Sequence, residues 1–167
     1  ASPLERCRQT AELLYPGQAP CVFDQFREMD FGAFEGHNCE ELKADVRYQA
    51  WIDSNGTLPF PQGESREQFQ RRCVEGFCKL LKEVWTRERS LSSFALVVHG
   101  GTIMALLGHF LGGEYFDYQV KCGQGYSGRL AFKAGGGAPQ WKEFRPLSEA
   151  TVSEAAVSEL TKGETNR

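Results

Sequence analysis

Residues 94–102 read Phe-Ala-Leu-Val-Val-His-Gly-Gly-Thr, and this stretch decides the fold class that we expect. Phe94–Val98 is a continuous apolar run, as in a central strand that is covered on both faces. A turn at His99 follows, and Ile103–Leu111 is predicted to be a helix. His99 therefore stands at the carboxyl end of a strand, which is where ligands bind in open α/β sheets.

Two strong helix patterns precede this stretch. Ser2 is predicted to cap a helix that runs to about Leu14, with Pro3 at its first position and Glu5 completing a capping box. The longest helix is predicted to start at Ser65. Its apolar residues recur at steps of three and four, which is typical of one buried stripe: Phe69, Cys73, Phe77, Leu80, Leu81, Val84 and Trp85.

The remaining elements complete an alternating pattern. Cys21–Phe23 is predicted to be a short buried strand, and an amphipathic segment from Asn38 to Trp51 a helix. Arg129–Ala134 and Trp141–Arg145 are predicted to pair as a hairpin through the glycine-rich segment 135–139. Alternation of strands and helices predicts an α/β three-layer sandwich with a mostly parallel sheet and helices on both faces.

The length and composition suit one domain with a real core. We expect it to span residues 1–146, with 147–167 as a tail or surface helix. A formal charge of −3 argues against a general nucleic-acid surface, although it leaves room for a small anionic ligand. No apolar run is long enough for a membrane span and no signal-peptide pattern opens the chain, so we expect a cytoplasmic protein.

The six cysteines form no C-x-x-C pair, so we expect no zinc or other metal site. They are interpreted as reduced, buried thiols that act as small hydrophobic residues.

Three residues are candidates for chemistry. His99 precedes two glycines and a helix, which outlines an anion site at a helix N-terminus, although a histidine hydrogen-bonded at a sheet edge fits the motif equally well. Arg6 lies early in the opening helix, where a solvated arginine is the ordinary alternative. Glu28 lies among aromatic residues, which raise the proton affinity of a carboxylate and suit a general acid.

Four motifs occur in order along the chain: Ser-Pro-Leu-Glu-Arg-Cys-Arg-Gln-Thr-Ala (2–11), Arg-Glu-Met-Asp-Phe-Gly-Ala-Phe-Glu-Gly (27–36), Gln-Gly-Glu-Ser (62–65) and Val-Val-His-Gly-Gly (97–101). Together they resemble the histidine phosphatase superfamily, the phosphoglycerate-mutase-like group, and especially its small bacterial phosphatases such as α-ribazole phosphatase. The resemblance extends from Ser2 to about Arg145.

The resemblance implies a role for each matching residue. Arg6 and His99 would bind the phosphoryl group, with the backbone at Gly100 adding donors. Glu28 would donate a proton to the leaving group, while Glu64 would be structural. Catalytic roles thus fall to Glu28 and His99, and phosphate binding to Arg6, His99 and Gly100, with no metal or other cofactor.

Members of the family begin with a strand that ends in Arg-His-Gly, whose histidine attacks phosphorus. This sequence holds only His37, His99 and His109, and none follows an arginine. We therefore expect a chain truncated at its N-terminus that lacks the first strand and the nucleophile.

The function that the resemblance implies is a metal-independent phosphomonoesterase that works through a phosphohistidine. Its substrate would be a small phosphorylated metabolite, with α-ribazole phosphate as one candidate. The chain as given is expected to have negligible activity. A phosphoglycerate-mutase-like phosphotransferase and an inactive phosphate-binding module are the alternatives, and the oligomeric state stays open.

Overall fold

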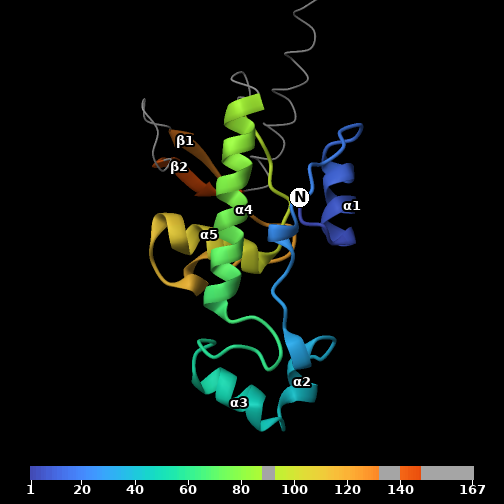
Figure 1. The fold of residues 1–167 in the computed structure, drawn as a ribbon, viewed down its shortest axis with the longest axis vertical. Coiled ribbons are helices and arrows are strands. Elements are labelled where there is room, and N and C mark those ends of the chain that lie inside the picture. The colour runs from blue at the N-terminus through green and yellow to red at the C-terminus, as the bar shows by residue number, and fades with distance from the viewer. Residues whose placement is uncertain (88–92, 132–139, 148–167) are drawn as a thin grey trace, which may run out of the picture. The chain divides into compact units, whose positions relative to one another are not determined.

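The computed structural model describes residues 1–87, 93–131 and 140–147 (Figure 1). The chain divides into two compact units, Ala1–Gln119 and Val120–Arg167, which are described separately. The expected division after residue 146 stays a prediction. The first unit holds the helices α1 (Glu5–Leu14), η1 (Asp24–Phe26), η2 (Gly32–Phe34), α2 (Cys39–Leu42), α3 (Val46–Asp53), α4 (Arg66–Arg87), α5 (Gly100–Leu111) and η3 (Tyr115–Tyr118).

The opening helix ends where the sequence predicts, but its start differs. α1 begins at Glu5 after Leu4 and has no side-chain cap, so the expected capping box of Ser2 and Glu5 is wrong. The Ser2 side chain is instead fully buried, and its hydroxyl lies within hydrogen-bond distance of the His99 ring. The Ser2 hydroxyl, which the local pattern assigned to a helix cap, is instead engaged in a long-range hydrogen bond with the buried His99 imidazole.

α4 confirms the longest predicted helix. Ser65 and Gln68 cap its start reciprocally, since each side chain accepts a hydrogen bond from the other's backbone N–H. Leu80 of the apolar stripe is half-buried, and the side chains of Val84 and Trp85 lie outside the described part. The other four members of the stripe are buried: Phe69, Cys73, Phe77 and Leu81. The buried stripe is the surface through which α4 packs against α5 and η1.

Residues 29–64 carry a small aromatic core of their own. The helix predicted from Asn38 to Trp51 is two helices, each with its own cap, because Asp45 accepts a hydrogen bond from the Arg47 N–H and starts α3. Phe34, Leu42 and Phe60 form the buried centre of this core, packed against Met29, Phe31, Ala33, Tyr48 and Trp51. The segment is therefore a packed substructure whose interior is separate from the stripe of α4.

Two glycines cross at the base of this substructure. Gly32 has a φ of +54°, and a Cβ added there would lie 2.2 Å from the Pro61 carbonyl oxygen and 2.5 Å from the Gly63 nitrogen. A Cβ on Gly63 would lie 2.4 Å from the Asp30 carbonyl oxygen. Only residues without a side chain allow the two backbones to approach so closely.

The two predicted strands of the first unit are absent. Residues 94–98 and 21–23 form no strand, and Phe94, Ala95, Cys21 and Val22 are exposed rather than buried. The Ser2 N–H donates to the Val97 carbonyl, and the Phe23 N–H donates to the Ala1 carbonyl. The Ala1 ammonium also donates to the Cys21 carbonyl at 2.6 Å. These few bonds link the three segments, but a strand needs a ladder of such bonds.

The second unit contains a hairpin, as predicted. β1 (Tyr126–Ala131) pairs antiparallel with β2 (Gln140–Pro146), with an irregularity between Ser127 and Arg129. This is the one sheet in the described ranges, so the expected parallel sheet and its three layers are not observed there. The predicted end of the first strand at 132–134, the connection at 135–139 and the tail from 148 lie outside the described residues.

Candidate functional site

His99 is held at the start of α5 by contacts to both of its ring nitrogens. It is the N-cap residue of the helix and is 5% exposed. Its Nε2 atom lies 2.7 Å from the Ser2 hydroxyl, and its Nδ1 atom lies 3.0 Å from Nη2 of Arg6. A guanidinium can only donate hydrogen bonds, so Nδ1 accepts and the ring proton resides on Nε2, which donates to Ser2.

These contacts keep the imidazole neutral. Burial, followed by the positive charge of Arg6, lowers the pKa of His99 to about 4. Near pH 7 the ring therefore offers a lone pair at Nδ1 rather than a positive charge.

Glu28 lies against the same ring nitrogen. Its Oε2 atom is 3.4 Å from Nδ1 of His99 and 3.7 Å from Nη2 of Arg6. Burial raises the pKa of this carboxyl above its ordinary value, against the lowering effects of a hydrogen bond from the Met29 N–H and of the Arg6 charge. A carboxyl group with a raised pKa is suited to donating a proton near neutral pH.

Two glycines at the first turn of α5, Gly100 and Gly101, leave space beside the Glu28 carboxyl. A Cβ on Gly101 would lie 3.0 Å from Oε1 of Glu28, whereas a Cβ on Gly100 would meet nothing within 4 Å. The first backbone N–H groups of a helix have no partner within the helix, and they carry its partial positive charge. The α5 helix thus presents free donors beside Arg6, Glu28 and His99.

The structure brings together the three side chains that the sequence singled out, since all pairs among Arg6, Glu28 and His99 lie within 3.7 Å. The side chain of Arg6 remains 60% exposed, so its guanidinium can reach an anion in solvent. A cleft of about 210 Å³ is lined by Glu28 together with Asp24, Arg27, Asp30, Glu64 and Arg72. Arg6 and His99 are not among the residues that line this cleft.

Ser2, His99 and Glu28 have the order of contacts of a serine hydrolase triad. Two observations exclude that chemistry. Ser2 is fully buried and cannot meet a substrate, and Arg6 donates to Nδ1 of His99, which a triad requires to carry a proton. Ser2 instead accepts the hydrogen bond from Nε2 of His99, while the Arg6 guanidinium fixes which ring nitrogen is protonated. The sequence pattern around Ser2 predicted a helix cap and gave no signal for its contact with His99.

Cys7 packs on the imidazole, with its sulfur 3.7 and 3.8 Å from the two ring nitrogens. Burial raises the pKa of this thiol, so it is a neutral packing partner. All six cysteines are free, yet only Cys7 and Cys73 are buried. The expectation that all six are interior is wrong for Cys21, Cys39, Cys78 and Cys122, which are exposed.

The described residues contain no group of three or more histidine, cysteine, aspartate or glutamate side chains placed to hold a metal ion. Within the same ranges, no helix combines the length and apolar character that a membrane crossing requires.

An exposed arginine and the N-terminus of a helix are groups that can bind a small anion, and a carboxyl with a raised pKa lies beside them. The chain belongs to the histidine phosphatase superfamily (branch 1), whose family model matches residues 1–141.

Solved structures similar to this chain include three informative cases. The α-ribazole phosphatase from Shigella flexneri is 23% identical with a TM-score of 0.65, over 84% of this chain and 69% of that one. Phosphoglycerate mutase from Thermus thermophilus is 29% identical with a TM-score of 0.51, over 88% and 72%. The protein TTHB049 from the same organism is 34% identical with a TM-score of 0.51, over 74% and 59%.

The chain thus spans 59% of the TTHB049 protein, and it spans 57% of a similar Escherichia coli chain. The search of curated proteins found no match.

Proposed function

We propose that this chain supplies the phosphate-binding and acid–base residues of a metal-independent phosphomonoesterase that acts on a small phosphorylated metabolite. The observation that carries the proposal is the convergence of Arg6, Glu28 and His99 at the N-terminus of α5. In this role Arg6, His99 and the backbone N–H of Gly100 bind the phosphoryl oxygens, and Glu28 handles the proton.

The proposed reaction has two steps, formation of a phosphohistidine and its hydrolysis. A histidine nitrogen from an Arg-His-Gly segment attacks phosphorus, the bond from phosphorus to the leaving oxygen breaks, and Glu28 protonates that oxygen. Water then attacks the phosphorus of the phosphohistidine and gives a proton to the Glu28 carboxylate. The new oxygen–phosphorus bond displaces the histidine nitrogen, the phosphorus–nitrogen bond breaks, and inorganic phosphate is released. The printed sequence contains no Arg-His-Gly, so we assign to its residues the binding and proton-transfer parts only.

The substrate class rests on the family and on two names among its members. α-Ribazole phosphate is one candidate, because an α-ribazole phosphatase shares the fold at 23% identity. A phosphotransferase of the mutase type is the second candidate, favoured by the 29% identity to a phosphoglycerate mutase. Release of inorganic phosphate without a bisphosphate cofactor would separate the phosphatase from the mutase.

A binding measurement tests the core of the proposal. Calorimetric titration with inorganic phosphate should show affinity that falls about tenfold or more in Arg6→Gln, because a charge-assisted hydrogen bond is worth about 1.5–3 kcal/mol. Arg8→Gln is the matched control, since Arg8 is exposed on the same helix and shows no described contact with His99. Equal affinity in the wild type and Arg6→Gln would refute the assignment of Arg6.

Turnover gives an independent test. We expect negligible hydrolysis of an aryl phosphate by the chain as given, since removal of a nucleophile abolishes most of the rate. The absence of Arg-His-Gly also favours a non-hydrolytic phosphate-binding module as an alternative. Robust turnover that disappears in His99→Ala would contradict both, because His99 would then be the nucleophile.

A further inference from the structure

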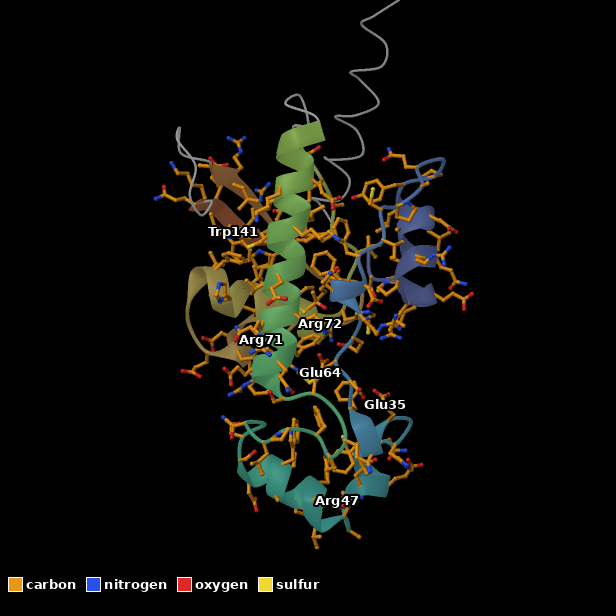
Figure 2. The ribbon with its side chains drawn as sticks, in the orientation of Figure 1. Glu35, Arg47, Glu64, Arg71, Arg72 and Trp141 are labelled. Atoms are coloured by element: carbon orange, nitrogen blue, oxygen red, sulfur yellow. The ribbon has the colours of Figure 1, made fainter. Side chains whose placement is uncertain are left out.

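Arg72 of α4 contacts both the Glu64 carboxylate and the backbone of the loop that carries Glu28. Its Nε and Nη2 atoms donate to the two carboxylate oxygens of Glu64 at 2.9 and 2.6 Å. Figure 2 shows the two side chains facing each other near the start of α4. This two-point pairing is the strongest geometry that an arginine forms with a carboxylate, and it fixes the plane of the guanidinium.

The fixed guanidinium then binds the backbone of the Glu28 loop at three points. Nη1 donates to the carbonyl oxygens of Gln25 at 2.9 Å and Arg27 at 3.0 Å, and Nη2 reaches the carbonyl of Glu28 itself at 3.4 Å. Backbone carbonyls held by one rigid fork cannot move independently. The segment before the Glu28 side chain is thus attached to α4.

Glu64 secures the segment that follows Glu28. Its Oε2 atom accepts the Asp30 N–H at 3.1 Å, and its backbone N–H donates to the Asp30 carbonyl at 2.9 Å. The Arg72 guanidinium also lies over the Phe69 ring, 5.1 Å from its centroid, and the same ring lies beside Gly101 in the candidate site. Glu28 is therefore held on both sides in sequence by one ion pair.

We infer that Arg72 and Glu64 are positioning residues that set where the Glu28 carboxyl stands relative to Arg6 and His99. The inference rests on the proposed role of Glu28 as proton donor. Their hydrogen bonds act on this site through the backbone of residues 25–30. The ion pair is only about a quarter exposed, which limits screening by solvent.

The test compares Arg72→Lys with Arg71→Lys, two substitutions that each keep the positive charge. A lysine at 72 is a point charge that cannot reproduce the fork, whereas Arg71 is exposed one residue earlier on the same helix (Figure 2). The first readout is the titration of the Glu28 carboxyl, monitored by carbon NMR on the labelled full chain. The charges acting on this carboxyl are those of Arg6, Glu35 and Arg72 itself, and both substitutions keep the sign of all three.

We expect the pKa of Glu28 in Arg72→Lys to fall toward the ordinary glutamate value, because the released loop lets water reach the carboxyl. Arg71→Lys should titrate like the wild type. A Glu28 titration that is unchanged in Arg72→Lys would overturn the inference, since the charge alone would then suffice.

Hydrogen exchange provides a second readout that also covers a variant of the partner. Glu64→Gln keeps the size of the side chain but weakens the two-point pairing. Protection of the Met29 and Asp30 N–H groups should drop about tenfold in both Glu64→Gln and Arg72→Lys, while protection within α5 stays unchanged. Unchanged protection at residues 29 and 30 would count against positioning.

Neither readout requires phosphate. Failure of the chain to bind phosphate would remove the proposed function and leave the positioning result to be read by itself.

Discussion

The Ser2 hydroxyl lies 2.7 Å from Nε2 of His99 and accepts the hydrogen bond from the one N–H of this ring. The hydroxyl also lies 3.3 Å from the Leu4 N–H, which donates to it. One buried side chain thus orients the histidine and begins the chain segment that leads to Arg6.

Substitution of Ser2 by alanine should therefore destabilise the protein. The change leaves the buried Nε2–H of His99 without an acceptor, which costs about 1–3 kcal/mol. Urea unfolding at neutral pH would measure this loss. Thr10→Ala is the matched control, because the Thr10 hydroxyl is exposed and bonds to the Arg6 carbonyl of its own helix, so we expect a change below about 0.5 kcal/mol. Equal effects of the two substitutions would contradict the role assigned to Ser2.

Helices of this chain could be predicted from sequence because their signals are local. The apolar stripe of α4 and the breakers after Leu14 placed two helices correctly. The strand predicted at 94–98 failed because a strand depends on a partner that its own residues do not specify. Within the described residues, the backbone of 94–98 pairs with another segment through one hydrogen bond, from the Ser2 N–H to the Val97 carbonyl.

The candidate site could be assembled from sequence only through resemblance to a family. Nothing in the spacing of Arg6, Glu28 and His99 says that they meet, since they lie on three elements far apart in the chain. The pairing of Arg72 with the loop at 25–28 was missed for the same reason, because its hydrogen bonds cross more than forty residues. Arg72 directly follows Arg71 in an amphipathic helix, and the sequence does not distinguish it from a solvated arginine.

Acid should weaken the fold through His99. The pKa of this residue is about 4 in the folded chain and near 6.5 in the unfolded chain. Between these values the unfolded chain binds a proton that the folded chain excludes. The stabilisation is therefore complete above pH 6.5 and is lost as the pH falls toward 4, by up to about 3 kcal/mol.

Glu28 acts in the opposite direction, because its raised pKa makes the folded chain bind the proton more readily. The clean comparison is therefore made in a Glu28→Gln background, by urea unfolding at about pH 7 and about pH 4.5. The chain with His99 should lose about 2 kcal/mol more on acidification than the chain with His99→Gln. An identical loss in the two would show that His99 is not held neutral.

The crossing of Gly32 and Gly63 predicts a severe local effect of a single methyl group. Gly32→Ala combines a positive φ with backbone atoms 2.2–2.7 Å from the new Cβ. Gly36 also has a positive φ, of +75°, but a Cβ there would meet nothing within 4 Å. Gly36→Ala should cost about 1–2 kcal/mol, whereas Gly32→Ala should cost about 2 kcal/mol more because backbone must move. Similar losses of thermal stability in both variants would remove the packing argument.

Anion binding should be coupled to uptake of a proton at His99. In the free chain the Arg6 guanidinium donates to Nδ1, so this nitrogen carries no hydrogen. Arg6 is largely exposed and can turn toward an anion seated at the first N–H groups of α5. Nδ1 then faces negative charge in place of a cation, which raises the proton affinity of the ring.

Sulfate is the suitable probe for this coupling, because it has the shape of phosphate and does not itself titrate near neutral pH. Calorimetry at about pH 6 in buffers of different ionisation enthalpy should show uptake that approaches one proton per bound sulfate. Uptake should vanish in His99→Gln and persist in His37→Gln, which removes an exposed imidazole instead. Binding that releases no buffer-dependent heat in the wild type would mean that Arg6 stays on Nδ1 when the anion is bound, and that His99 serves the site as a neutral support for the guanidinium.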